Sequence, residues 1–148
     1  MKNLLAKFEN ICNKGQDVAL LFLRLIIAYG FWEPAKTKWA DINSVAEWFG
    51  TIGIPAPKLN AYLSASVEMA GVFLLILGLG TRLISVPLMI TMVVAIITVH
   101  WVNGFAAGEN GFEIPLYFML MLFVLVCFGG GRISVDYLIK RMRKNSGQ

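Results

Sequence analysis

Residues 83–101 read LISVPLMITMVVAIITVHW, and this stretch decides the fold class. Between Arg82 and Glu109 the only titratable side chain is His100, so the stretch has the length and apolar character of a membrane-crossing helix. Residues 114–128 form a second such stretch, because no Asp, Glu, Lys, Arg or His occurs between Glu113 and Arg132. The sequence therefore predicts at least two membrane helices.

Two further apolar stretches each carry one charge. Residues 18–32 contain Arg24 and residues 59–79 contain Glu68. The first stretch could instead be the apolar part of a signal peptide, but a charge in the middle of that part argues against cleavage. With both stretches included, we predict an all-α integral membrane protein built on a bundle of four transmembrane helices.

The composition of the whole chain agrees with a membrane protein. Of the 148 residues, 57% are hydrophobic and 15% charged, where a soluble domain has about 25% charged residues. So little charge excludes a disordered chain, a coiled coil and a small disulfide-bonded secreted protein. The net charge of +4 comes from the chain ends, so it indicates membrane topology and not nucleic-acid binding.

The distribution of Lys and Arg predicts the orientation in the membrane. With four crossings, both termini and the turn before Arg82 share one side, which carries nine Lys or Arg, while the other side carries three. The positive-inside rule then places both termini in the cytoplasm and the loops 33–58 and 102–113 outside. We therefore expect a multi-pass protein of a bacterial inner membrane, with the lipid bilayer as its first partner.

Amphipathic helices are predicted around this membrane domain. Apolar residues repeat at helical spacing within 1–17, within 42–49 and after Ser134, which suggests helices that lie on the membrane surface. Pro34 is expected to end the first membrane helix, and the Gly and Pro residues of 53–57 to break the chain before the second. The predicted organisation is an inner-surface helix (1–17), a membrane domain (18–131) and a basic cytoplasmic tail (132–148).

Arg24 and Glu68 are expected to form an ion pair inside the membrane. If helices 18–32 and 59–79 are antiparallel neighbours, the rise of about 1.5 Å per residue brings both charges near mid-depth. Inserting an unpaired charge at this depth costs roughly 2.5–3.5 kcal/mol on insertion scales. We therefore expect the two charges to pair with each other. Two roles are open for the pair, a structural one and the lining of a substrate or proton path. Ser64 and Gly71 share the face of Glu68 and allow neighbouring helices to approach closely.

A second group of candidate site residues lies on the predicted outer face. His100 could relay protons, and the aromatic rings around it could hold a flat amphipathic molecule, although such rings also anchor membrane proteins at the interface. The candidates are Trp32, Glu33, Lys36, Lys38, Trp39, His100, Trp101, Asn103 and Glu113.

The chain contains no recognisable catalytic motif. It has no Walker loop, GxGxxG, HExxH or CxxCH, and a single His excludes a bis-His haem within the chain. Cys12 and Cys127 are far apart without CxxC spacing, so we expect free thiols and no metal site. Catalytic residues are accordingly not predicted.

Several motifs together resemble the DoxX family of small bacterial inner-membrane proteins. They are LLFLRLIIAYGF, IGIPAP, VEMAGVFLLILGLGTRL, VHWVNGF, NGFEIPLYFML and GGGRISVDYL, which span residues 18–138. The resemblance implies a four-helix bundle in which the matching positions are Arg24, Lys36 or Lys38, Glu68, Arg82, His100, Asn103, Gly104, Glu113, Arg132, Ser134 and Asp136.

The family resemblance leaves two functions open. The family takes its name from a small subunit associated with a thiosulfate:quinone oxidoreductase, and relatives accompany thioredoxin-like or superoxide-handling partners. The resemblance thus implies that the chain is a subunit of a redox or stress-related system, in which it handles quinone or passes electrons to a partner. The segment Trp32–Lys36 departs from the family pattern and is more like a branch found beside maturation enzymes for secreted copper-binding peptides.

The alternative is therefore a non-enzymatic scaffold or maturation factor for a partner enzyme or a copper-binding peptide. A small transporter would need a polar path through the membrane, at which only Arg24 and Glu68 hint. The partners expected besides lipid are a soluble or membrane protein and a second copy of the chain.

Overall fold

A computed structural model describes residues 2–146, with side chains described at Cys12 and in residues 15–145. The described residues form helices joined by short turns, which confirms the all-α fold class. In chain order the elements are α1 (Lys2–Ala40), α2 (Ile42–Thr51), α3 (Pro57–Leu77), α4 (Thr81–Ala95), the π-helical turn η1 (Ile96–His100), the 3₁₀ turns η2 (Trp101–Asn103) and η3 (Ala107–Glu109), α5 (Glu113–Phe128) and α6 (Val135–Ser146).

Three of the helical segments are long and apolar enough to cross a membrane. They are Gly15–Ala40, Pro57–Leu77 and Thr81–Asn103, which correspond to the first three predicted crossings. The fourth predicted crossing is α5, which is apolar but has only 16 residues. At 1.5 Å per residue it rises about 24 Å, somewhat less than the hydrocarbon thickness of about 30 Å.

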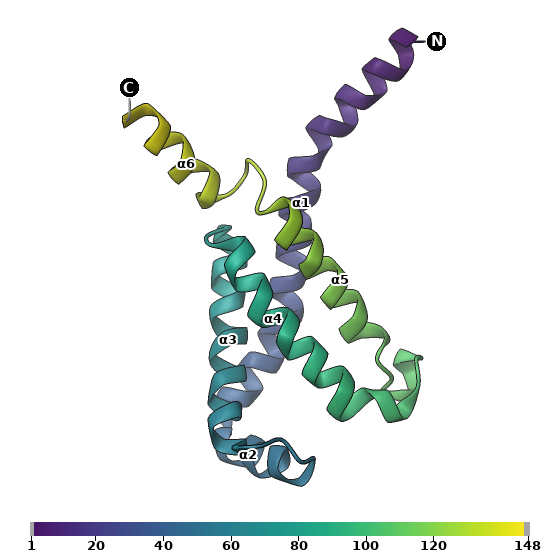
Figure 1. Cartoon of the computed structure of the whole chain (residues 1–148), viewed down its shortest axis with the longest axis vertical. Coiled ribbons are helices and arrows are strands. Elements are labelled where there is room, and N and C mark those ends of the chain that lie inside the picture. The colour runs from purple at the N-terminus through teal and green to yellow at the C-terminus, as the bar shows by residue number, and fades with distance from the viewer. Residues whose placement is uncertain (1, 147–148) are drawn as a thin grey trace.

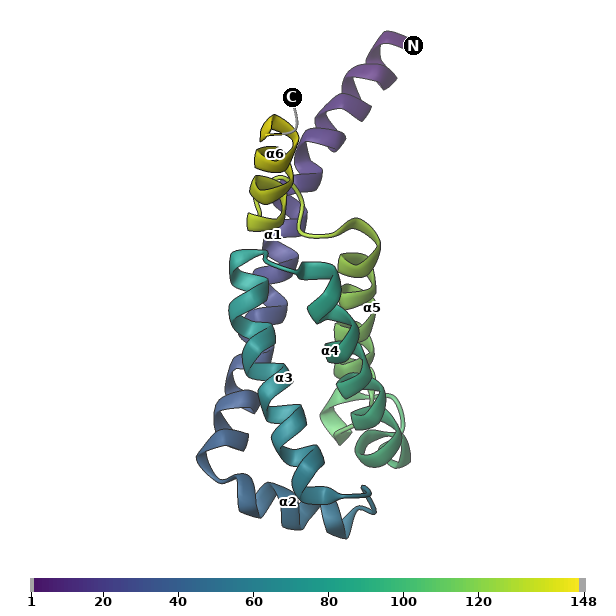
Figure 2. The ribbon, with the colours of Figure 1, turned by 60° about the vertical axis from the view of Figure 1, so that its left-hand side comes forward.

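The helices are arranged in two pairs with the chain termini at one end. α1 packs on α3, and α4 packs on α5. Both termini and the turn between α3 and α4 lie at one end of the molecule, which we call the termini end (Figure 1). The opposite end carries α2 and the η turns, and we call it the α2 end. Turning the molecule shows α2 crossing beneath the bundle (Figure 2).

The core lies between the two pairs and depends on small residues for close packing. Ile27, Leu75, Leu88, Leu122 and Leu125 are fully buried. A Cβ atom added to Gly71 would come within 2.8 Å of the Leu88 side chain, so this glycine lets α4 approach α3. The structure thus confirms the prediction of a close helix contact at Gly71.

The prediction that Pro34 ends the first helix is wrong. α1 runs from Lys2 to Ala40 as one helix with Pro34 inside it. A proline removes one backbone hydrogen bond and kinks a helix, at a cost that other contacts can offset. Here the turn after Pro34 is held against α3 by Lys38, which pairs with Glu68, and by Trp39, which donates a hydrogen bond to the Ala65 carbonyl.

The same continuous helix also differs from the separate surface helix predicted for residues 1–17. The backbone shows no break at residue 17. The apolar side chains on which that prediction was based, Leu4, Leu5, Phe8 and Ile11, lie outside the described side chains. The other two short helices are present, because α2 covers the predicted residues 42–49 and α6 starts directly after Ser134.

Local sequence explains where these helices begin. The Asp41 carboxylate accepts a hydrogen bond from the Ser44 backbone N–H and caps α2. Gly53 adopts a positive φ of 81°, and Pro57 occupies the first turn of α3, as the predicted chain break requires. The Ser134 hydroxyl accepts a hydrogen bond from the Tyr137 N–H and caps α6.

Candidate functional site

A cavity of about 830 Å³ opens between the two helix pairs at the α2 end. α1 and α3 supply one side, α4 and η1 the other, and α2 with the turn 53–55 closes the end. Most of the wall is apolar, including Phe31, Phe49, Val67, Met92 and Phe118. Only a few polar side chains interrupt it, which is the composition typical of a small-molecule site.

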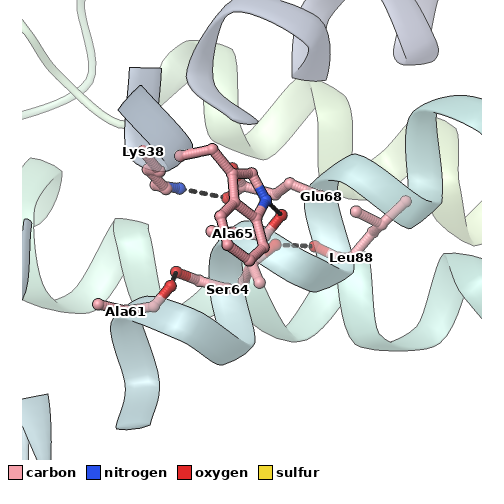
Figure 3. A network of polar contacts seen from close by, with 8 residues as sticks. Lys38, Ala61, Ser64, Ala65, Glu68 and Leu88 are labelled. Atoms are coloured by element: carbon pink, nitrogen blue, oxygen red, sulfur yellow. Dashed lines mark hydrogen bonds and ion pairs between the residues drawn. The ribbon is translucent and has the colours of Figure 1, made fainter. Parts of the chain in front are cut away.

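An ion pair between Lys38 and Glu68 forms part of this wall. The Lys38 Nζ lies 2.5 Å from Glu68 Oε1, and the Glu68 residue is only 2% exposed (Figure 3). Lys38 projects from the last turn of α1, and Glu68 lies in the middle of α3. A buried carboxylate is tolerated only with a partner of this kind, so the pair fixes both side chains against each other.

The second carboxylate oxygen of Glu68 has no partner in the described part of the chain. Oε2 is buried and accepts no hydrogen bond. Glu68 lines the cavity, so this oxygen is a buried, unused acceptor on a residue of the cavity wall. A buried acceptor without a hydrogen bond costs about 1–3 kcal/mol, more when it is charged, so it favours any occupant that can donate to it.

His100 lines the cavity at the end nearest the loop that joins α4 to α5. It is the last residue of the π-helical turn, a conformation often found at functional sites. Its Nδ1 lies 2.8 Å from the Asn110 carbonyl oxygen, which can only accept a hydrogen bond. This contact assigns the proton to Nδ1, and the neutral imidazole therefore offers Nε2 as an acceptor.

The structure brings together three of the predicted site residues, namely Lys38, Glu68 and His100. It adds a polar stripe that the sequence analysis missed. Asn60 and Ser64 precede Glu68 at intervals of four on α3, and Thr91 and Thr98 face them from α4 and η1. Polar residues at intervals of four in an apolar helix share one face, and this spacing could have identified the stripe.

The remaining outer-face candidates do not line the cavity. Glu33 and Lys36 form an exposed ion pair with N and O 3.0 Å apart. The tryptophan rings pack on other aromatic rings: Trp32 on Phe73, Trp39 on Tyr62, and Trp101 on Phe112. None of these three rings lines the cavity.

Asn103 and Glu113 organise the loop between η1 and α5. The Asn103 side chain donates to the Asn110 carbonyl, the same oxygen that the His100 ring contacts. The Glu113 carboxylate accepts hydrogen bonds from the Ala107 N–H and the Tyr117 hydroxyl. Both residues therefore act on the loop that positions His100.

The predicted pair between Arg24 and Glu68 is wrong. Arg24 is fully buried and donates hydrogen bonds to the carbonyls of Leu75 and Ile133, while Glu68 pairs with Lys38. The continuation of α1 beyond Pro34 explains the difference, because it brings Lys38 to the depth of Glu68. In the same antiparallel packing Arg24 lies two helical turns further along α3, opposite Leu75.

Arg24 belongs instead to a network that closes the termini end. Its contact with Ile133 connects α1 to the segment that precedes α6. Asp136 in α6 accepts hydrogen bonds from the backbone N–H groups of Gly80 and Thr81 at 2.7 and 3.0 Å and so caps α4. The acceptor that caps α4 thus comes from a residue distant in sequence.

Comparisons with known proteins identify the family. The DoxX family profile matches residues 19–101. A Haemophilus influenzae "Uncharacterized protein" is 34% identical over 86% of this chain and 87% of its own length. The "Putative oxidoreductase CatD" of Bacillus subtilis is 30% identical over 90% and 96%, respectively. The "Uncharacterized membrane protein Rv3486" of Mycobacterium tuberculosis is 37% identical over 80% and 79%. No solved structure matches significantly. The chain, which has three helices long and apolar enough to cross a membrane among its described residues, is a membrane protein of the DoxX family.

Proposed function

We propose that this protein is a membrane subunit of a redox system and that its cavity binds the ring of a quinone. The observation that carries the proposal is the cavity of about 830 Å³, in which an apolar wall surrounds the Lys38–Glu68 pair and His100. A quinone has the matching chemistry, because its ring is flat and mostly apolar with one polar oxygen at each end. The volume of the cavity falls within the range of about 300–1,000 Å³ that is common for small-molecule sites.

The position of the cavity supports a lipid-soluble ligand. Its lining comes from helices that are long and apolar enough to cross a membrane. The side chains of Ile90 and Val94 line the cavity and are also exposed at the surface of these helices. An isoprenoid tail could therefore leave the cavity toward the lipid while the ring stays inside.

In this proposal the chain binds and orients the ring, and a partner protein exchanges electrons with it. Glu68 and His100 are the groups that could hold or pass the protons that accompany quinone chemistry. The redox role has further support from the name of one relative, the "Putative oxidoreductase CatD" of Bacillus subtilis, which is similar over nearly the whole chain.

The proposal includes four membrane crossings with both termini in the cytoplasm. α5 then crosses beside α4 despite its 16 residues, with its flanking loops at the membrane surfaces. The nine Lys and Arg at the termini end support this orientation. The α2 end and its cavity then lie toward the outer side of a bacterial inner membrane.

A matched pair of substitutions on α4 tests the proposal. Val93 and Val94 are neighbours with nearly equal exposure, 39% and 40%, but only Val94 lines the cavity. Binding of a short-chain ubiquinone and of its hydroquinone is measured by calorimetry on protein in lipid nanodiscs. We expect saturable binding to the wild type and to Val93→Trp, and at least a tenfold loss in Val94→Trp.

Two results would reject the quinone site. One is the absence of saturable binding of either redox form to folded wild-type protein, which would favour a scaffold that binds a protein partner. The other is an equal loss of binding in Val93→Trp and Val94→Trp, which would place the ligand outside the cavity.

A further inference from the structure

The unused polar atoms of Glu68 and His100, two residues of the cavity wall, are hydrogen-bond acceptors. Glu68 Oε2 is buried and accepts no hydrogen bond from the described residues. His100 donates through Nδ1 to the Asn110 carbonyl, which leaves Nε2 of the neutral ring as an acceptor. Both residues line the same cavity, one on α3 and the other at the end of η1.

The hydroxyl groups of the cavity wall use their hydrogens within their own helices. Ser64 donates to the Ala61 carbonyl at 3.1 Å, Thr91 to the Leu88 carbonyl at 2.7 Å, and Thr98 to the Val94 carbonyl at 2.8 Å. Each hydroxyl then presents only lone pairs to a ligand. The Lys38 ammonium directs one hydrogen to Glu68 Oε1.

From this polarity we infer that the cavity prefers the reduced, hydroquinone form of its ligand. The inference rests on the proposed function and specifies the redox state that is bound. A quinone carries two carbonyl oxygens, which only accept hydrogen bonds, whereas a hydroquinone carries two phenolic hydroxyls, which donate them. Only the reduced ring complements an acceptor such as Glu68 Oε2.

Glu68 is the residue that discriminates between the two forms. A phenolic hydroxyl donates to Oε2 while Lys38 keeps its contact with Oε1, so the carboxylate has a partner on each oxygen. Hydrogen bonds to an ionised carboxylate are about twice as strong as neutral ones. A quinone carbonyl would instead face the carboxylate as a second acceptor. It would have to bind through the remaining hydrogens of Lys38 or through the second amide hydrogen of Asn60, whose Nδ2 also donates to the Pro55 carbonyl.

The test compares three ligands built on the same ring, using wild-type protein in nanodiscs under anaerobic conditions. They are a short-chain ubiquinone, its hydroquinone, and the dimethyl ether of that hydroquinone, which keeps the ring but has no hydroxyl hydrogen. We expect the hydroquinone to bind at least about tenfold more tightly than the other two, the factor typical of one hydrogen bond to a charged group.

Glu68→Gln reverses the polarity of the site, because the amide places an N–H₂ group where the carboxylate oxygen was. We expect this variant to lose the preference for hydroquinone and to bind the quinone at least as well. Glu33→Gln is the matched control, since Glu33 pairs with Lys36 on the exposed surface and does not line the cavity. It should keep the wild-type preference.

The outcomes separate this inference from the proposed function. Failure of all three ligands to bind wild-type protein would reject the quinone site itself. Equal or tighter binding of the quinone or the dimethyl ether to the wild type would overturn the inference and leave the site intact. If Glu68→Gln does not fold, the comparison of the three ligands on wild-type protein still tests the hydroquinone preference. A folded Glu68→Gln variant that still prefers hydroquinone would also overturn the inference.

Discussion

Lys38 and Glu68 form an ion pair whose side chains are largely buried. The pair joins the last turn of α1 to the middle of α3, and its carboxylate is almost fully buried. A second pair on α1, between Glu33 and Lys36, has the same chemistry but is exposed on both sides. The two pairs allow the effect of burial on an ion pair to be measured within one protein.

We expect strong coupling in the buried pair and little in the exposed one. Lys38→Met and Glu68→Leu each leave an uncompensated buried charge and should lower the free energy of unfolding by about 3–5 kcal/mol, while the double variant should be near neutral. The exposed pair, tested with Glu33→Leu and Lys36→Met, should couple by no more than about 1 kcal/mol. Unfolding in mixed detergent micelles measures both cycles, and additive effects in the buried pair would contradict the structure.

Arg24 should be sensitive even to replacement by lysine. Its guanidinium donates to the carbonyls of Leu75 and Ile133, and a single ammonium cannot span both in the same geometry. We expect Arg24→Lys to cost about 1.5–3 kcal/mol and to speed hydrogen exchange in the segment 129–136. Arg82→Lys is the control, because Arg82 is exposed and donates to one carbonyl, that of Cys127. Equal effects of the two substitutions would contradict this role of Arg24.

The sequence could identify these charges but not their partners. Arg24 and Glu68 are recognisable because each interrupts an apolar stretch, and both are buried in the structure. Which side chain they meet depends on how α1 and α3 are aligned. That alignment follows from the packing of the whole interface, and the expected end of the helix at Pro34 concealed Lys38 as a partner.

At the level of helices, α2 depends on the residue that caps its start, Asp41. The pKa of the Asp41 carboxyl is lowered, chiefly by the hydrogen bond from the Ser44 hydroxyl and also by its backbone N–H. The pKa of Asp41 in the folded protein lies below its ordinary value. The cap therefore stabilises α2 to its full extent at any pH above that ordinary value. Its contribution is lost as the pH falls through the lowered pKa.

This cap predicts a dependence on Ser44 that can be measured by NMR titration. Ser44→Ala removes the hydroxyl donor and should raise the pKa of Asp41 toward its ordinary value of about 3.9. The start of α2 should then begin to fray at a higher pH than in the wild type. An Asp41 titration that is the same with and without the Ser44 hydroxyl would contradict the cap.

Helix positions were more predictable than their irregularities. The apolar stretches located α3, α4 and α5 closely, because length and lack of charge are local properties. The continuation of α1 through Pro34 and the π-helical turn at Ile96–His100 could not be read from the sequence. Both depend on contacts with distant residues, which offset the cost of a poor local geometry.

For the whole molecule, the charge distribution predicts which end faces the cytoplasm. Both termini share one end, opposite α2 and the η turns (Figure 1). We expect Ser44→Cys and Gly108→Cys, in a background lacking Cys12 and Cys127, to react in intact cells with an impermeant maleimide. Ser146→Cys should react only after the cells are opened. Labelling of Ser146→Cys alone in intact cells would invert the orientation.

The cavity at the α2 end is the central claim, and protection of a thiol inside it tests that claim most directly. Ser64 lines the cavity, whereas Ser44 on α2 does not. In the background without native cysteines, the rate at which Ser64→Cys reacts with methyl methanethiosulfonate is measured with and without saturating short-chain ubiquinol. The account predicts at least a severalfold slower reaction of Ser64→Cys with ligand and an unchanged reaction of Ser44→Cys. An unchanged rate for Ser64→Cys in the presence of bound ubiquinol would contradict it.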